Sequence, residues 1–412
     1  MINRFMTKLI EENIKHFPVI LLAGPRQIGK STTLYHDFLD KGYSYVTLDD
    51  KLELAIATSD PRSFLELHPA PLTIDEAQDV PELFVEIERI VNKSRLENGN
   101  AKTNGMYILS GSSKQKLLDE AKESLSGRVG ILDMSDLSLN EILGFDNLPF
   151  AVDLKENSKR SKRFSLNEKE IFKYIARGFF PALYDDPELN TQIFYSSYIS
   201  TYLEKDLRGI IGITDEAKFM NFLRFLASNT GEELVYDNYA KQVGVVTNTV
   251  KSWISSLVKT GIIYLVEPYK EDSIAKRIVK RPKMYFFDTG LAAYLCGMDS
   301  PETLEKSSLK GRFFETFVFN EIRKTYINSG IRQELNYYRD SDQNEVDLIL
   351  LRNGEISCIE IKSGQNFNTS YTKGFKKLDA SKFIHGKNAI ICSSDKISML
   401  NDETLVLPVS SI

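Results

Sequence analysis

A glycine-rich segment near the amino end of the 412-residue chain has the residue types needed to hold phosphate groups. It reads Gly-Pro-Arg-Gln-Ile-Gly-Lys-Ser and fits the pattern G-x-x-x-x-G-K-[ST]. Its glycines let backbone N–H groups curl around phosphate oxygens, Lys30 adds charge for the β- and γ-phosphates, and Ser31 offers a hydroxyl to Mg²⁺. We therefore expect ATP and Mg²⁺ to bind here, although an ordinary glycine turn is the alternative. The predicted contacts are Gly24, Pro25, Arg26, Gln27, Ile28, Gly29, Lys30, Ser31 and Thr32.

Two acids at the end of another apolar run have the chemistry to complete a triphosphate site. In Leu72-Thr73-Ile74-Asp75-Glu76, Asp75 would stand at the carboxyl end of a buried parallel strand, where open α/β sheets bind ligands. We expect Asp75 to hold Mg²⁺ through water and Glu76 to polarise the attacking water, with Lys30 also catalytic. A further run ends in Ser110, which is either a sensor of the γ-phosphate or part of an ordinary polar loop.

Alternating strands and helices must position these residues. Such alternation predicts a parallel α/β sheet over residues 1–150, with a helix at Glu82–Lys93. The expected strands are Val19–Ala23, Tyr45–Leu48, Leu72–Asp75, Met106–Ser110 and Val129–Met134.

A predicted hairpin near the carboxyl end brings two acids together. Glu345–Leu351 and Ile356–Lys362 are rich in Val, Ile and Leu, and Asn353-Gly354 between them is a strong two-residue hairpin signal. Counting back from this loop puts Asp347 directly opposite Glu360. Like charges in that position are destabilising, so we expect a second Mg²⁺ or Mn²⁺ between them.

A third acid is expected to join this cation site. Glu315 falls on the apolar stripe of a predicted helix, where an acid is costly unless it is paired or bound to metal. The same count puts Glu345 opposite Lys362. In the alternative interpretation, Lys362 pairs with Glu345, and Asp347 is merely solvated.

The middle of the chain has three predicted parts. Residues 151–169 are polar and predict a mobile linker, and residues 170–230 have helical spacing of apolar residues. Residues 231–300 predict a winged helix-turn-helix, with helices at 238–243 and 248–259.

The predicted winged helix offers a surface for nucleic acid. Its second helix exposes Asn248, Lys251 and Lys259, and a basic run from Ala275 to Lys283 follows. Polar and basic groups of this kind favour contact with the DNA backbone. Protein packing, with the basic run as a solvated face, is an equal alternative.

Composition limits the remaining classes. The net charge of −5 requires any contact with nucleic acid to come from local patches. The three cysteines are scattered, which predicts neither a zinc site nor disulfides and suits a reducing cytoplasm. No apolar run has the length of a membrane span and the amino end lacks a long apolar stretch, so we expect a cytoplasmic protein with no membrane partner.

These motifs together resemble prokaryotic AAA-type ATPases fused to a C-terminal domain of uncharacterised function. Ser124–Arg128, Tyr202–Arg208 and Tyr285–Leu291 also carry the resemblance. It implies that Arg128 serves the phosphates of a neighbouring subunit, which would require a homo-oligomer.

The C-terminal acids resemble the PD-(D/E)XK nuclease pattern of a helix Glu, a strand Asp and then Glu-x-Lys. The matching residues are Glu315, Asp347, Glu360 and Lys362. The resemblance implies that the three acids bind metal and that Glu360 and Lys362 are catalytic.

The expected fold is therefore α/β and multidomain. It comprises a P-loop AAA-type parallel sheet, a helical region with a winged helix-turn-helix, and a restriction-endonuclease-like domain over residues 305–412. The expected function is an ATP-hydrolysing switch that acts on DNA, with a metal-dependent nuclease-like domain. The alternatives are an ATP-controlled regulator that binds DNA or protein without cleavage, and a chaperone-like ATPase.

Overall fold

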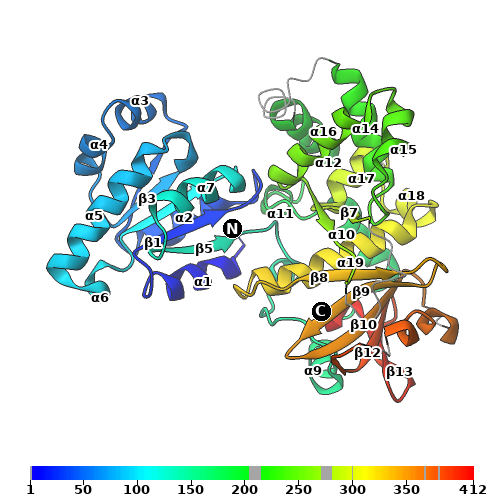
Figure 1. Ribbon diagram of the computed structural model, residues 1–412. Coiled ribbons are helices and arrows are strands. Elements are labelled where there is room, and N and C mark those ends of the chain that lie inside the picture. The colour runs from blue at the N-terminus through cyan, green and yellow to red at the C-terminus, as the bar shows by residue number, and fades with distance from the viewer. Residues whose placement is uncertain (1, 204–214, 271–280, 299, 366–367, 379–380) are drawn as a thin grey trace.

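The computed structural model describes residues 2–203, 215–270, 281–298, 300–365, 368–378 and 381–412. Figure 1 shows an amino-terminal α/β unit beside a helical middle region and a C-terminal β-rich unit. Most of the segment Tyr202–Arg208, which contributes to the family resemblance, lies outside the described residues. None of the described helices has the length and apolar character needed to span a bilayer.

The first sheet has five parallel strands in the order β2-β3-β4-β1-β5. Every residue of β1, β3 and β4 is buried, as expected of strands covered by helices on both faces. The predicted parallel sheet is thus confirmed. Its strands are β1 (Val19–Ala23), β2 (Ser44–Thr47), β3 (Leu72–Asp75), β4 (Tyr107–Gly111) and β5 (Val129–Asp133).

Helices cover the two faces of this sheet through alternate residues of its strands. Ile20 and Leu22 of β1 belong to the apolar cluster that includes α1 and α2, whereas Val19 and Leu21 belong to the cluster that includes α5 and α7. The helices of this unit are α1 (Phe5–Asn13), α2 (Lys30–Leu39), α3 (Lys51–Ser59), α4 (Pro61–Leu67), α5 (Glu82–Asn98), α6 (Asn100–Thr103), α7 (Lys114–Ser124) and α8 (Leu139–Leu143).

The stretch 151–169, predicted to be a mobile linker, instead contains helix α9 (Leu154–Arg160). Asp153 caps its first turn, Asn157 donates to the Ser411 carbonyl, and the buried Arg160 donates to the Leu148 and Pro149 carbonyls. The prediction was wrong because polar side chains suggested solvent exposure, whereas here they bond the backbone of neighbouring segments.

The middle region is helical, and α15, α16 and β6 lie where the sequence predicted two helices and a strand. α15 and α16 are joined at Gly244, and β6 pairs antiparallel with β7. Of the basic run, residues 275–280 lie outside the described residues. The elements are α10 (Glu168–Arg177), α11 (Ala182–Asp185), α12 (Thr191–Tyr198), the π-helix η2 (Ile199–Leu203), α14 (Glu216–Ser228), α15 (Tyr236–Val243), α16 (Thr247–Lys259), β6 (Ile263–Val266), β7 (Lys283–Phe286), α17 (Thr289–Leu295) and α18 (Pro301–Lys306).

The C-terminal unit is a mixed sheet in the order β13-β14-β12-β10-β9-β8, with β11 beside β10. β8, β9 and β10 are antiparallel, whereas β12 runs parallel to both β10 and β14. Its elements are α19 (Lys310–Ile327), β8 (Leu335–Arg339), β9 (Glu345–Arg352), β10 (Glu355–Lys362), β11 (Ile384–His385), β12 (Asn388–Cys392), β13 (Ser398–Asn401) and β14 (Thr404–Pro408).

The predicted hairpin register is confirmed. Arg352 pairs with Glu355, and the ladder continues in step to Leu348 opposite Ile359. The two loop residues, Asn353 and Gly354, have φ of 53° and 79°, as a tight type I′ turn requires.

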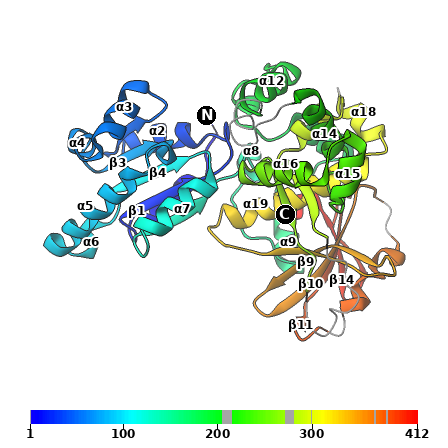
Figure 2. The same cartoon turned by 45° about the horizontal axis from the view of Figure 1, so that its top comes forward.

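Helix α19 joins the parts of the molecule. In Figures 1 and 2 it lies between the helical middle region and the C-terminal sheet. One apolar cluster continues from the first sheet through Phe222 of α14 and Phe317 of α19 to Ile391 of β12. Because this core is continuous, the units pack on one another as in a single body.

Candidate functional site

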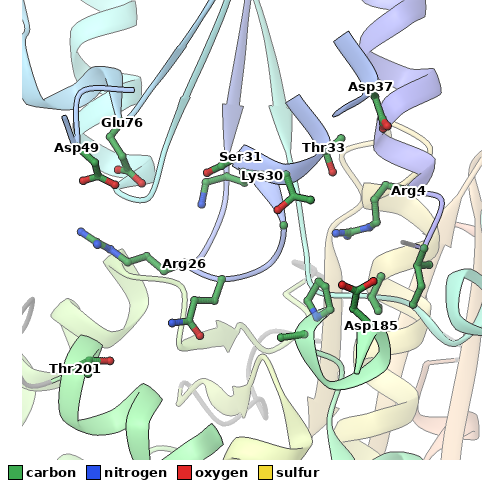
Figure 3. A pocket seen from close by; sticks show the side chains of 17 residues that line it. Arg4, Arg26, Lys30, Ser31, Thr33, Asp37, Asp49, Glu76, Asp185 and Thr201 are labelled. Atoms are coloured by element: carbon green, nitrogen blue, oxygen red, sulfur yellow. The ribbon is translucent and has the colours of Figure 1, made fainter. Parts of the chain in front are cut away.

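The predicted phosphate loop connects β1 to α2, and Lys30 is the first residue of that helix. The Lys30 ammonium donates hydrogen bonds to the carbonyls of Gly24 at 2.8 Å and Pro25 at 2.7 Å. A side chain at position 24 would bring Cβ within 2.4 Å of the Met134 carbonyl, so the loop needs glycine there. The amino end of α2 and the Lys30 side chain both border the cavity beside the loop (Figure 3).

The protonation of the Lys30 side chain depends on the charges around it. It is buried, and burial lowers the pKa of its ammonium from 10.5 to about 8, although Glu76 and Asp75 act in the opposite direction. A phosphate group beside this ammonium would favour its charged form.

Asp75 lies at the carboxyl end of β3, as predicted, and its carboxylate is held by hydroxyl groups. Ser110 and Tyr45 donate to it at 2.5 and 2.9 Å. Ser110 is fully buried, so it positions Asp75, and the predicted contact between Ser110 and the γ-phosphate is not supported. Tyr45 thus helps to position one of the two predicted Mg²⁺ ligands. Tyr45 was not predicted as a site residue, because an aromatic residue in a strand gives no distinguishing signal.

Glu76 follows Asp75 with a left-handed backbone, φ 54°. Its carboxylate oxygen Oε2 accepts hydrogen bonds from Gln78 at 2.5 Å and from the Ser112 hydroxyl at 2.8 Å. A left-handed backbone is unusual for glutamate, and such strain is often found at functional sites. The Glu76 side chain lines the cavity described below (Figure 3).

A cavity of about 650 Å³ lies at the mouth of this loop. The predicted residues that line it are Arg26, Gln27, Gly29, Lys30, Ser31, Thr32 and Glu76. Gly24, Pro25, Ile28, Asp75 and Ser110 are not among its lining residues. The opposite wall comes from the middle region, through Pro181, Ala182, Asp185 and Thr201. A ligand in this cavity would therefore touch two units of the chain at once.

The donor set fits a magnesium nucleotide. Lys30 supplies a cation, Ser31 a hydroxyl and Asp75 a carboxylate, and hard oxygen ligands are those that Mg²⁺ prefers. The cavity also has the size of a small-molecule site.

Arg4 is a second residue beside the phosphate loop that was not predicted. Its guanidinium donates to the Ile28 carbonyl of the phosphate loop at 2.6 Å, to the Ser135 carbonyl at 2.7 Å and to Glu141 at 3.0 Å. Glu141 is distant in sequence, so no local pattern predicts this partner.

Arg128 lies away from the cavity. Its carbonyl accepts from Val19 at the start of β1, while the phosphate loop leaves the other end of this strand, roughly 16 Å away at about 3.3 Å per residue. Its guanidinium contacts Asn92 at 2.7 Å and Glu88 at 3.3 Å. Arg128 therefore does not serve the site of its own chain.

The acids predicted for the C-terminal site do come together. Lys362 contacts Glu360 at 2.6 Å and Asp347 at 3.5 Å, so these acids share one face of the hairpin. Asp347 also accepts from the Ile361 amide at 2.7 Å. Glu345 does not pair with Lys362 and instead contacts Lys283. Both the predicted pairing of Glu345 and the solvated Asp347 of the alternative are therefore wrong.

A lysine contacts two of the three acids that the sequence predicted to bind a metal ion, Glu315 and Asp347. The Lys283 ammonium lies 2.9 Å from Glu315, 2.6 Å from Glu345 and 3.9 Å from Asp347, and its side chain is 3% exposed. Lys283 ends the basic run that was expected either to contact DNA or to form a solvated face; both expectations are wrong for Lys283, because it begins the buried strand β7.

The donor geometry does not support the predicted second metal in this state. Within the described part of the chain, no three or more His, Cys, Asp or Glu side chains are arranged to hold a metal ion. Burial raises the pKa of Glu315 to about 7 and that of Glu360 to about 8. Burial lowers the pKa of Lys283, but the surrounding carboxylates outweigh it and hold that pKa well above its usual value.

Helix α16 exposes the polar side chains that were predicted to be exposed. Asn248, Lys251 and Lys259 of α16 are exposed, and Val246 before the helix is 69% exposed. At its other end α16 meets the phosphate loop, because a Cβ added at Gly261 would lie 2.8 Å from Pro25 Cγ.

Three family models match the chain. Residues 16–143 match an AAA domain, residues 168–302 match the domain of unknown function DUF8612, and residues 310–412 match the domain of unknown function DUF4143. The chain thus has an amino-terminal AAA-type P-loop ATPase domain followed by two domains of unknown function. The AAA-type domain predicted from the sequence is confirmed.

Similar proteins add little about function. Uncharacterised proteins of Mycobacterium tuberculosis and Mycobacterium bovis are each 25% identical over 398 residues, which cover 96% of this chain and 81% of theirs. The Walker-type ATPase PABY2304 of Pyrococcus abyssi has a TM-score of 0.43 and 16% identity, covering 70% of this chain and 94% of that chain. The RuvB Holliday junction branch migration motor of Thermotoga maritima has a TM-score of 0.29 and 13% identity, covering 64% and 89%. At such low TM-scores neither structure carries an argument about this chain.

Proposed function

We propose that this protein is an ATP-hydrolysing switch. The observation that carries the proposal is the cavity lined by Lys30, Ser31 and Glu76, with Asp75 directly before Glu76 at the end of β3. Lys30 would neutralise the β- and γ-phosphates, while Ser31 and Asp75 would hold Mg²⁺. Glu76 would orient and polarise the attacking water once its bonds to Gln78 and Ser112 rearrange.

Hydrolysis in solution tests this proposal. Released phosphate is measured for wild type, Lys30→Ala and, as a matched control, Lys41→Ala near the other end of α2. We expect turnover in wild type and in Lys41→Ala, and none in Lys30→Ala. Equal turnover in the two lysine variants, or none in wild type, would rule the proposal out.

The contacts around the loop support coupling of ATP to the winged helix. The cavity wall includes Pro181 and Thr201 from the middle region, and Gly261 touches Pro25 of the loop just after α16. A change in this loop on binding or losing a γ-phosphate would therefore bear directly on the carboxyl end of α16.

DNA is the proposed target of that switch. The support for it is the exposed polar face of α16, with Asn248, Lys251 and Lys259, in a helix-turn-helix with an antiparallel wing. Because Lys283 contacts Glu315 and Asp347, two of the three predicted metal ligands, we restrict this proposal to DNA binding without cleavage in this state of the protein.

Salt dependence tests the DNA proposal. The Lys251→Ala/Lys259→Ala variant should bind DNA more weakly, and the plot of log K against log salt should flatten by about 0.9 for each DNA phosphate that the variant no longer neutralises. Lys93→Ala, on α5 of the ATPase domain, is the control and should change neither. A DNA affinity that does not change with salt concentration, or that is the same in the α16 variant as in wild type, would favour a protein partner instead.

A further inference from the structure

The C-terminal acids outnumber the cationic side chains that contact them. We call Glu315, Glu345, Asp347 and Glu360 the acid cluster. Its four carboxylates contact two ammonium groups, Lys283 and Lys362, and Glu345 also contacts Arg339 at 3.6 Å.

One carboxylate oxygen in the acid cluster still lacks a donor. Glu360 is 8% exposed, and among the described residues its Oε2 atom is buried without a hydrogen-bond partner. Its other oxygen contacts Lys362, which also contacts Asp347, so the side chain is directed into the cluster. Such an unsatisfied oxygen calls for a cation or a proton.

We propose that the Lys283 ammonium occupies the cation position of the acid cluster and excludes a divalent cation from it. The cluster is assembled from α19, β9 and β10, whereas Lys283 is supplied by β7 of the winged helix. The winged helix thus closes a site that belongs to the C-terminal domain. With Lys283 removed, the site presents only oxygen donors beside Lys362, which suits Mn²⁺ or Mg²⁺.

The geometry explains why an ammonium works as the closing group. Lys283 reaches Glu315 on α19 and Glu345 on β9 at once, and Tyr285, two residues further along β7, donates to Glu315 at 2.7 Å. A compact point charge can face carboxylates from several directions. Lys283 offsets the repulsion among Glu315, Glu345 and Asp347, whereas Lys362 contacts the Asp347 and Glu360 pair between which the sequence predicted a metal ion.

The contacts between the wing and the C-terminal sheet keep this lysine in place. Tyr269 donates its amide to the Tyr337 carbonyl at 2.7 Å, and Arg339 contacts Glu233 at 3.0 Å. Tyr285 stacks on Phe319 of α19, with ring centroids 4.4 Å apart. Closure of the acid cluster is therefore tied to how the winged helix sits on α19 and β8.

Metal-dependent melting of the full-length, nucleotide-free protein tests the proposal. Wild type in EDTA and in 1 mM MnCl₂ should melt at the same temperature. Lys283→Met should melt lower in EDTA and gain about 2 °C or more with Mn²⁺, because a ligand of the folded state stabilises it. Lys283→Met/Glu360→Gln should lose most of that gain, and electron paramagnetic resonance of Mn²⁺ should report binding in the single variant alone.

Lys324→Met is the matched control, because Lys324, which lies on α19, is also a buried lysine in contact with carboxylates, those of Asp136 and Glu321. It should not respond to Mn²⁺. If Lys283→Met is unfolded in EDTA, Mn²⁺ should restore its folded signal. In that case the melting temperature with and without Mn²⁺ is also measured for Lys283→Met/Glu315→Gln, which carries one buried negative charge fewer.

Three results would overturn the proposal. The first is a rise in the melting temperature of wild type with Mn²⁺ equal to that of Lys283→Met. The second is such a rise in Lys324→Met. The third is the absence of Mn²⁺ binding by both Lys283→Met and Lys283→Met/Glu315→Gln. The experiment contains no nucleotide, so a failure of the proposed ATPase function would leave its result unchanged.

Discussion

ATP binding should weaken as the pH rises above about 8, because the phosphate-loop lysine loses its proton there. Burial lowers the pKa of Lys30 to about 8 in the nucleotide-free protein. Bound phosphates would supply the negative charge that raises it again, so binding must take up a proton whenever Lys30 starts out neutral.

The size of the effect follows from that pKa. With an ammonium that titrates at about 8, the protonated fraction falls from about three quarters at pH 7.5 to roughly a thirtieth at pH 9.5. If the bound form stays protonated throughout, the Kd for Mg-ATP should rise about 20-fold over this range. At pH 8.5, binding should take up about three quarters of a proton.

Calorimetry in buffers of different ionisation enthalpy measures both the affinity and the proton uptake. Lys30→Arg is the matched variant, because a guanidinium keeps its charge over the whole range and should remove the pH dependence. A wild-type Kd that stays constant from pH 7.5 to 9.5, or an equal slope in Lys30→Arg, would refute the reasoning about Lys30.

Two further predictions concern buried charges outside the phosphate loop. Lys324→Met leaves Asp136 and Glu321 buried without their cation. The free energy of unfolding, measured in denaturant, should therefore fall by about 3–5 kcal/mol. A loss below about 1 kcal/mol would contradict this prediction. Burial and Asp347 raise the pKa of Glu360 from 4.5 to about 8, so between these values the folded chain holds more protons than the unfolded chain. Stability should therefore fall as the pH rises through this window, and Glu360→Gln should flatten the decline; an unchanged slope would contradict the assignment.

Local sequence patterns predicted the parts of the molecule that depend on neighbouring residues. The phosphate loop followed from a fixed spacing, and the parallel strands from apolar runs. The C-terminal hairpin was predicted to the residue because the Asn353-Gly354 turn fixes the register of both strands at once.

The features that the sequence did not predict depend on contacts between residues far apart in the chain. Lys283 looked like one more residue of a basic run, and its carboxylate partners lie on α19 and β9. The only local signal was its position directly before the apolar residues Met284-Tyr285-Phe286. Arg4 likewise bonds Glu141, and neither spacing nor composition encodes such a pair. The linker prediction failed because polar residues of α9 bond distant backbone groups.

The most direct test of the central claim, ATP hydrolysis at the loop, is single-turnover hydrolysis by Glu76→Gln. The amide keeps the shape of the side chain but cannot take up a proton, so we predict normal ATP binding with hydrolysis slowed about 100-fold or more. Asp79→Asn, the same change on the turn that follows Glu76, should hydrolyse ATP at the wild-type rate. Hydrolysis by Glu76→Gln at the wild-type rate would contradict the account.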